Sequence, residues 1–228
     1  MAIRHQPNKN MKISNKFILT SVLIGSISAA NAAIFANDII GLDFGITAAT
    51  NNYNTLSAVN TGSTSLTELS GGSVITGVSV TTSGFSFSNN DSDHLVGTGP
   101  LSSNESNLTD WWGGSGTITF SGLDDSLVYD LTLGHAFNVN ATNTDTTFTV
   151  DGTTITTYHD NVAGSSYGTL TGLSTDGAGN LTISASPAAG SAVAAISALT
   201  LTANTVPEPT SAALLGLGGL ALITRRKR

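Results

Sequence analysis

Two pairs of closely spaced carboxylates are the residues best suited to bind a metal ion. Asp91 and Asp93 stand one residue apart in SNNDSDH, and Asp124 and Asp125 are adjacent in GLDDS. Carboxylate oxygens are ligands that calcium prefers, so Asp91 and Asp93 are our candidate for a structural calcium site. Neither pair fits the spacing of an EF-hand loop. The alternative is that these acids only lie in solvated turns.

Two adjacent tryptophans, Trp111 and Trp112 in TDWWGGSGT, are candidates for sugar binding. Exposed indole rings are rigid and amphipathic and could stack on sugar rings. Neighbouring residues of an extended segment point to opposite faces, so the sequence predicts one ring inside and one outside. The alternative is that one or both indoles fill an end of the hydrophobic core.

Residues that could perform catalysis follow no known pattern. The chain has no cysteine, which excludes thiol catalysis, disulfides and thiolate metal sites. His94, His135 and His159 stand apart without zinc-binding spacing, and no G-x-S-x-G elbow is present. The acids carry no signature that would place two of them across a cleft. We therefore expect a protein that is not an enzyme and that needs no cofactor other than the candidate calcium.

The charged residues divide the chain into a middle and two ends. The 228-residue chain has a net charge of −7, yet no Lys or Arg lies between Lys16 and Arg225. All fifteen acids lie within this stretch, fourteen of them between Asp38 and Asp176, so the middle is strongly negative. Phosphate binding needs clustered basic residues, so nucleic acid is excluded as a partner. The middle must be stabilised by burial and hydrogen bonds rather than by Lys or Arg ion pairs.

The middle, residues 34–203, has the composition of one all-β domain. Ser, Thr, Asn and Gly dominate it; Thr and Val favour strands, whereas Gly and Asn favour turns. No stretch has a sustained helical period. The spacing of the strands and turns predicts an antiparallel β-sandwich. The predicted strands are Asp38–Phe44, Ser73–Thr82, Thr117–Phe120, Leu127–Phe137, Thr146–Val150, Thr153–Tyr158, Tyr167–Leu173, Leu181–Ala185 and Val193–Leu201.

Three local patterns add detail to these strands. The alternation in Ser73–Thr82 places all three of its valines on one face. The same alternation in Leu127–Phe137 places Leu127, Tyr129, Leu131 and Leu133 on one side. The dipeptide Asp-Gly at 151–152 separates two predicted strands and indicates a two-residue hairpin.

The order of motifs in the middle resembles that of galactose-binding-like jelly-roll domains. GLDFG opens the region, GLDDSLVYDLTLG leads into a Tyr-bearing strand, TTFTVDGTT contains a hairpin, and DGAGNLTISAS precedes the last strand. The resemblance covers residues 38–203 and implies two packed antiparallel sheets. Such domains often carry a structural calcium. A β-sandwich of another topology is the alternative.

Residues 1–33 have the three parts of a secretory signal peptide. Lys12 and Lys16 supply a positive start, an apolar stretch follows, and Ala30 and Ala32 form a small-x-small cleavage site. Met11 is an alternative start of the chain. A buried N-terminal helix is the alternative interpretation of the whole segment.

Residues 204–228 contain a second apolar stretch, with a proline-rich motif before it and basic residues after it. The motif is Val206, Pro207, Glu208 and Pro209, and the basic end is Arg225, Arg226, Lys227 and Arg228. The apolar stretch between them is shorter than the roughly twenty residues of a simple bilayer span. The basic end would be retained on the cytoplasmic side. These features predict a short transmembrane helix that stops export.

The same features, in this order, resemble the PEP-CTERM sorting signal of exported bacterial proteins. In that family a membrane protease-transpeptidase, exosortase, recognises the tail and removes it. The resemblance implies exosortase as a partner during processing and a membrane-anchored intermediate. It also implies a final location at the cell surface or in the extracellular matrix. An ordinary membrane anchor with a chance Pro-Glu-Pro sequence is the alternative.

Together these features predict an exported, exosortase-processed structural or adhesive protein that associates with exopolysaccharide. One alternative is a non-catalytic carbohydrate-binding module that uses Trp111 or Trp112. The other alternative is an enzyme that acts on polysaccharide.

Overall fold

The computed structural model describes residues 34–45, 52–90, 101, 110–134, 144–158 and 166–206. The regular elements assigned within these residues are all β-strands, with no helix among them. The predicted signal-peptide helix and the predicted C-terminal transmembrane helix fall outside them. Within the described residues, no helix is long and apolar enough to cross a membrane.

The strands are short to medium in length. Their bounds are β1 (Ile39–Phe44), β2 (Asn54–Leu56), β3 (Gly62–Ser63), β4 (Leu66–Thr67), β5 (Val74–Ile75), β6 (Ser79–Ser83), β7 (Phe87–Asn90), β8 (Asp110–Gly113), β9 (Gly116–Ser121), β10 (Leu127–Gly134), β11 (Thr146–Val150), β12 (Thr153–Thr157), β13 (Tyr167–Leu173), β14 (Leu181–Pro187), β15 (Ala195–Ile196) and β16 (Ala198–Thr205).

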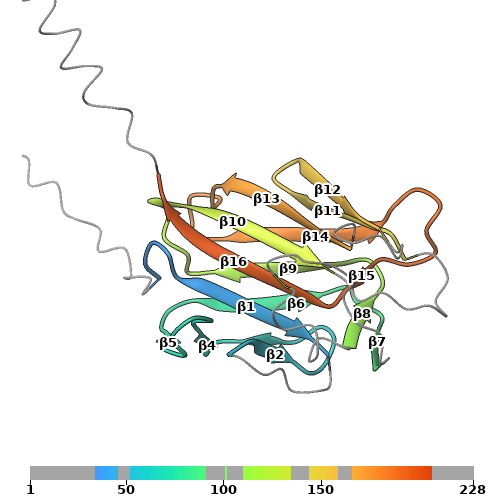
Figure 1. The fold of residues 1–228 in the computed structure, drawn as a ribbon, viewed down its shortest axis with the longest axis horizontal. Coiled ribbons are helices and arrows are strands. Elements are labelled where there is room, and N and C mark those ends of the chain that lie inside the picture. Colours follow the sequence, from blue (N-terminus) through green and yellow to red (C-terminus); the bar gives the residue numbers. More distant parts are fainter. Residues whose placement is uncertain are drawn as a thin grey trace, which may run out of the picture.

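Two large sheets form the body of the domain. Sheet A has the order β13-β10-β16-β1-β2, and sheet B has the order β12-β11-β14-β9-β6-β3. The strands of sheet A cross over those of sheet B in Figure 1, and two smaller sheets, β15-β8-β7 and β4-β5, complete the fold. From β9 onward the chain passes repeatedly between the two large sheets, as in a jelly roll. The predicted antiparallel β-sandwich is therefore confirmed, with β1–β2 as a parallel pair.

The larger of two hydrophobic clusters among the described residues joins the two large sheets. The alternation in β10 buries Tyr129, Leu131 and Leu133 completely, as the sequence predicts. These residues share a core cluster with Phe120 and Phe148 of sheet B. Burial of each large apolar side chain contributes about 1.5–3 kcal/mol. This core is the main source of stability in a domain whose sequence offers no Lys or Arg ion pairs.

The prediction of one continuous strand over Ser73–Thr82 is wrong. The chain bends at Thr76 and Gly77, and β5 and β6 belong to different sheets. Val78 and Val80 point into the core, but Val74 is 61% exposed because the bend shifts the alternation by one position. Periodicity within a segment does not reveal such a bend.

The predicted strand Val193–Leu201 is also divided in two. β15 pairs with β8, whereas β16 lies between β1 and β10 in sheet A. Ser197 lies at the crossing and is fully buried. Its N–H donates to the Gly134 carbonyl at 2.9 Å, and its carbonyl accepts from Phe44 N at 2.8 Å. These bonds satisfy the backbone where the chain changes sheets.

The predicted two-residue hairpin at 151–152 is confirmed. β11 and β12 pair from Thr146 opposite Thr157 to Val150 opposite Thr153. Asp151 and Gly152 have φ values of 46° and 76°. Two central residues with positive φ form a type I′ turn, whose twist matches that of the flanking strands.

Candidate functional site

The last strand of sheet A ends where the proline motif begins. β16 ends at Thr205, and Val206 is 47% exposed. β16 pairs with β10 on one side and with β1 on the other, so this central strand has both of its neighbours before the motif starts. The rest of the predicted sorting motif lies outside the described residues, as do the basic end and the cleavage site at Ala30 and Ala32.

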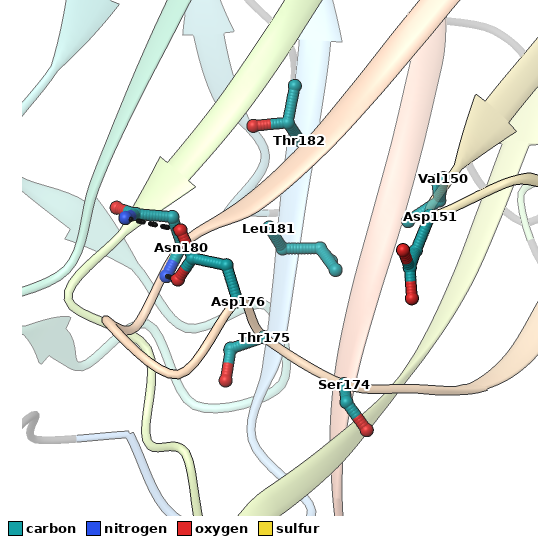
Figure 2. A pocket seen from close by; sticks show the side chains of 8 residues that line it. All are labelled: Val150, Asp151, Ser174, Thr175, Asp176, Asn180, Leu181 and Thr182. Atoms are coloured by element: carbon teal, nitrogen blue, oxygen red, sulfur yellow. Dashed lines mark hydrogen bonds between the residues drawn. The ribbon is translucent and has the colours of Figure 1, made fainter.

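A pocket of about 220 Å³ lies between the β11–β12 hairpin and the β13–β14 connection (Figure 2). Pairing of β11 with β14 stops at Thr149 opposite Ser184, while β14 continues along β9 as far as Leu181. The end of β11 and the start of β14 therefore separate and leave the pocket. Its lining consists of Val150, Asp151, Ser174, Thr175, Asp176, Asn180, Leu181 and Thr182.

Asp176 at this pocket is held by donors of its own turn. Its Oδ1 accepts from Ala178 N at 2.9 Å and from Asn180 N at 3.0 Å, and its Oδ2 accepts from Asn180 Nδ2 at 3.0 Å. The hydrogen bond from the Asn180 side chain, followed by those from the backbone, lowers the pKa of Asp176. A general acid needs a carboxyl group with a raised pKa, so the lowered pKa of Asp176 does not favour that role. The hydrogen bonds that Asp176 accepts hold its turn instead.

The two acids of GLDDS are also used by turns. Asp125 Oδ1 accepts from Thr175 Oγ1 and from Gly179 N, the latter at 2.9 Å. Asp124 Oδ1 accepts from Ser126 N at 2.8 Å and from Ser126 Oγ at 2.7 Å. Asp125 therefore ties the turn before β10 to the loop before β14.

Tyr129 holds the same turn from inside the core. Its hydroxyl accepts from Asp124 N at 2.9 Å and donates to the Asp124 carbonyl at 3.0 Å. Burial is the main cause that raises the pKa of Tyr129 to about 12. The hydrogen bond with the Asp124 backbone lowers this pKa, whereas the charges of Asp124 and Asp125 raise it further. The phenol therefore stays protonated and acts as a structural anchor.

A metal site is not found among the residues that the structure describes. These residues contain no group of three or more His, Cys, Asp or Glu side chains that could hold an ion. The candidate calcium ligands Asp91 and Asp93 lie outside the described residues. Calcium binding at those two residues stays a prediction.

Trp111 and Trp112 lie on β8 and are both buried. Trp112 is fully buried against the rings of Phe44 and Phe85, with centroids 5.1 and 5.5 Å away. Trp111 contacts the Phe87 ring at 5.3 Å and is only 6% exposed. The prediction of one outward-pointing ring is wrong, because Trp111 is covered as well. A sugar ring would find no open indole face to stack on at either position.

The terminal motif is the feature that comparison with known families identifies. Residues 205–228 match the PEP-CTERM protein-sorting motif. The chain carries a PEP-CTERM sorting signal. This signal implies export, a membrane-anchored sorting step and processing by exosortase, and it marks a surface protein. The match begins at the last residue of β16.

Solved structures with low similarity match part of the chain. The YxiM protein of Bacillus subtilis is 15% identical with a TM-score of 0.40, over 73% of this chain and 40% of that one. The GH26-CBM35 β-(1,4)-mannanase of Podospora anserina is 18% identical with a TM-score of 0.30, over 57% and 29%. The exo-β-1,3-galactanase of Phanerochaete chrysosporium, solved with galactose, is 17% identical with a TM-score of 0.27, over 64% and 34%. The match spans less than half of each of these chains. No curated protein matches the chain in sequence.

Proposed function

We propose that the β-sandwich acts outside the cell as a non-catalytic structural or adhesive protein that associates with exopolysaccharide. The observation that carries this proposal is the junction between the sandwich and its sorting signal. β16 is the middle strand of sheet A, and the signal begins at its last residue, Thr205. Removal of the tail beyond Val206 takes none of the described strands from either large sheet. A finished domain is therefore released at the surface.

The chemistry of the pocket supports a non-catalytic role. Its lining contains no Lys, Arg, His or Cys, so catalysis there would depend on its two carboxylates, Asp151 and Asp176. Hydrolysis of a glycosidic bond would need one carboxyl group kept protonated by a raised pKa. The pKa of Asp176 is shifted in the opposite direction.

The distribution of charge supports a role outside the cell. Cleavage after Ala32 and near Pro207 would remove every Lys and Arg of the chain, because none lies between Lys16 and Arg225. The released domain would have a net negative charge, since it keeps its Asp and Glu residues and no Lys or Arg. Like-charged copies repel one another, which keeps an exported domain soluble until it meets its partner.

Mass spectrometry of the chain recovered from its own cells tests this route. We expect an N-terminus after Ala32 and a C-terminus within or next to residues 206–209. A Pro207→Ala, Pro209→Ala double variant should retain its tail and remain in the membrane fraction. Asn204→Ala, just before the motif, is the matched control and should be processed normally.

The role in the matrix has a separate test. Cells lacking the chain should shed more polysaccharide into the medium and adhere less well, and the wild-type chain should release no reducing sugar from their polymer. Unchanged cohesion would contradict the proposed role, and release of reducing sugar would contradict its non-catalytic character.

A further inference from the structure

The outer face of sheet B carries only hydroxyl side chains. At its centre lie three neighbouring strands, β11, β14 and β9. The residues of these strands that we use to define the hydroxyl face are Thr147, Thr149, Thr182, Ser184, Thr117 and Thr119. They are exposed or half-buried, while alternating residues such as Ile118 and Ile183 are fully buried. The edge-side neighbours β6 (SVTTS) and β12 (TTITT) extend the face with Ser or Thr at every outward position.

Hydroxyl groups on this face meet across neighbouring strands. Ser83 Oγ lies 2.8 Å from Thr117 Oγ1, and Thr119 Oγ1 lies 3.2 Å from Thr182 Oγ1. Thr147 Oγ1 and Thr156 Oγ1 are also 3.2 Å apart. Each hydroxyl has one donor and two acceptor positions, so members of such pairs retain capacity for an outside partner. The sheet repeats these groups about every 4.8 Å across strands and roughly every 6.8 Å along them.

Charge is absent from the hydroxyl face although the middle of the chain is rich in acids. The described acids near sheet B lie in its turns, as Asp151 and Asp176 do, or just before a strand, as Asp145 does. None occupies an outward position of β6, β9, β11, β12 or β14. The large exposed hydrophobic side chains of the described residues also lie off these five strands. The face is therefore neither charged nor apolar.

We propose that the hydroxyl face is the docking surface for a neutral polysaccharide chain. This inference rests on the proposed function and names the surface and the class of polymer. An anionic polymer would be repelled, since the acidic middle has no Lys or Arg to offset its charge. A second copy of the domain would need apolar and aromatic residues at the centre of the interface, and this face has none. A neutral polymer of sugars matches the face in charge and offers the same mixture of donors and acceptors.

The ligand must be a polymer rather than a free sugar. Each contact with an exposed hydroxyl replaces a contact with water and therefore contributes little by itself. Many such contacts made along one chain add up, because the first contact raises the effective concentration of the next. We expect long chains to bind measurably and glucose to compete poorly.

A binding assay with two insoluble neutral polymers, cellulose and cross-linked dextran, tests this proposal. The purified full chain is mixed with each polymer, and the protein that remains in solution is measured. Moderate salt screens the charge of the basic ends. The Thr117→Val, Thr149→Val, Thr182→Val triple variant removes one hydroxyl from each central strand and preserves side-chain shape and strand preference. We expect it to bind about tenfold more weakly to the neutral polymer that the wild type binds. Serine at the same three positions keeps the hydroxyls and should bind within about twofold of the wild type.

The matched control places the same change on sheet A. The Thr169→Val, Thr171→Val, Thr202→Val variant should bind as the wild type does. The proposal is overturned if the wild type binds neither polymer, or if the sheet B valine variant, shown by its thermal melt to be folded, binds like the wild type. Equal loss in the sheet A control would overturn it too. If the protein is processed and holds the matrix together but fails these binding tests, the docking surface is contradicted and the proposed function is not.

Discussion

Glu68 shows how one carboxylate can be buried in a domain that has no basic partner for it. It is 7% exposed and accepts hydrogen bonds from Ser70 N at 3.0 Å, from Ser70 Oγ at 2.8 Å and from Gly71 N. A longer contact of 3.4 Å comes from Ile39 N at the start of β1. Burial by itself would raise the pKa of Glu68, but the donors together outweigh it and lower that pKa. Backbone donors therefore take the place of Lys and Arg.

The lowered pKa of Glu68 predicts a dependence of stability on pH. A carboxylate with a folded-state pKa below its unfolded value stabilises the fold above that unfolded value, about 4.3, and the stabilisation is lost as pH falls through the folded pKa. At pH 7 we expect Glu68→Gln to reduce the free energy of unfolding by about 1–3 kcal/mol. The difference from the wild type should shrink on acidification. Urea unfolding at several pH values measures this, and a difference that does not change with pH would refute the role of ionised Glu68.

At the scale of the elements, two turns that lie far apart in the sequence touch at Gly122. This residue has a φ of 80°, and a Cβ placed on it would lie 2.0 Å from the Gly77 carbonyl oxygen. The turn after β9 can therefore pack against the bend before β6 only with glycine at this position. Gly152 in the β11–β12 hairpin has a similar φ of 76° but no atom within 4 Å of its added Cβ.

This contrast predicts different costs for the same substitution. Gly152→Ala should reduce the free energy of unfolding by about 1 kcal/mol, which is the penalty of a left-handed backbone for an L-residue. Gly122→Ala should cost about 3 kcal/mol, since the steric clash adds to that penalty. Chemical denaturation of the two variants measures the difference. Equal losses would mean that the contact between the two turns does not constrain the fold.

For the whole molecule, the position of the basic residues predicts how trypsin acts. Trypsin cuts after Lys and Arg, and none lies between Lys16 and Arg225, so the sandwich should survive intact even after unfolding. Trimming should leave the melting temperature unchanged, because no strand of the described sheets lies before Ile39 or after Thr205. Mass spectrometry and circular dichroism before and after digestion check both points. A lower melting temperature after trimming would show that the removed ends support the fold.

Local sequence patterns are sufficient to predict three features of this protein. The sorting signal at 205–228, the type I′ turn at 151–152 and the buried side of β10 each depend on residues close together in the chain. The all-β class follows from composition and alternation in the same way. The short strands, such as β2 and β7, have too few residues to show a period. No short-range pattern could place the bend at Gly77 or the crossing at Ser197.

The sequence by itself determined that the chain carries a sorting signal for export and that its middle is an all-β sandwich, because both depend on patterns within contiguous residues. Only the tertiary structure decided that Trp111 is covered like Trp112, since partners such as Phe44 and Phe87 come from other strands. It also decided which Ser and Thr residues share one face. Thr119 and Thr182 are 63 residues apart and become neighbours only through the pairing of β9 with β14. Alternation tells which way a side chain points from its strand, but the order of strands in a sheet is set by packing of the whole core.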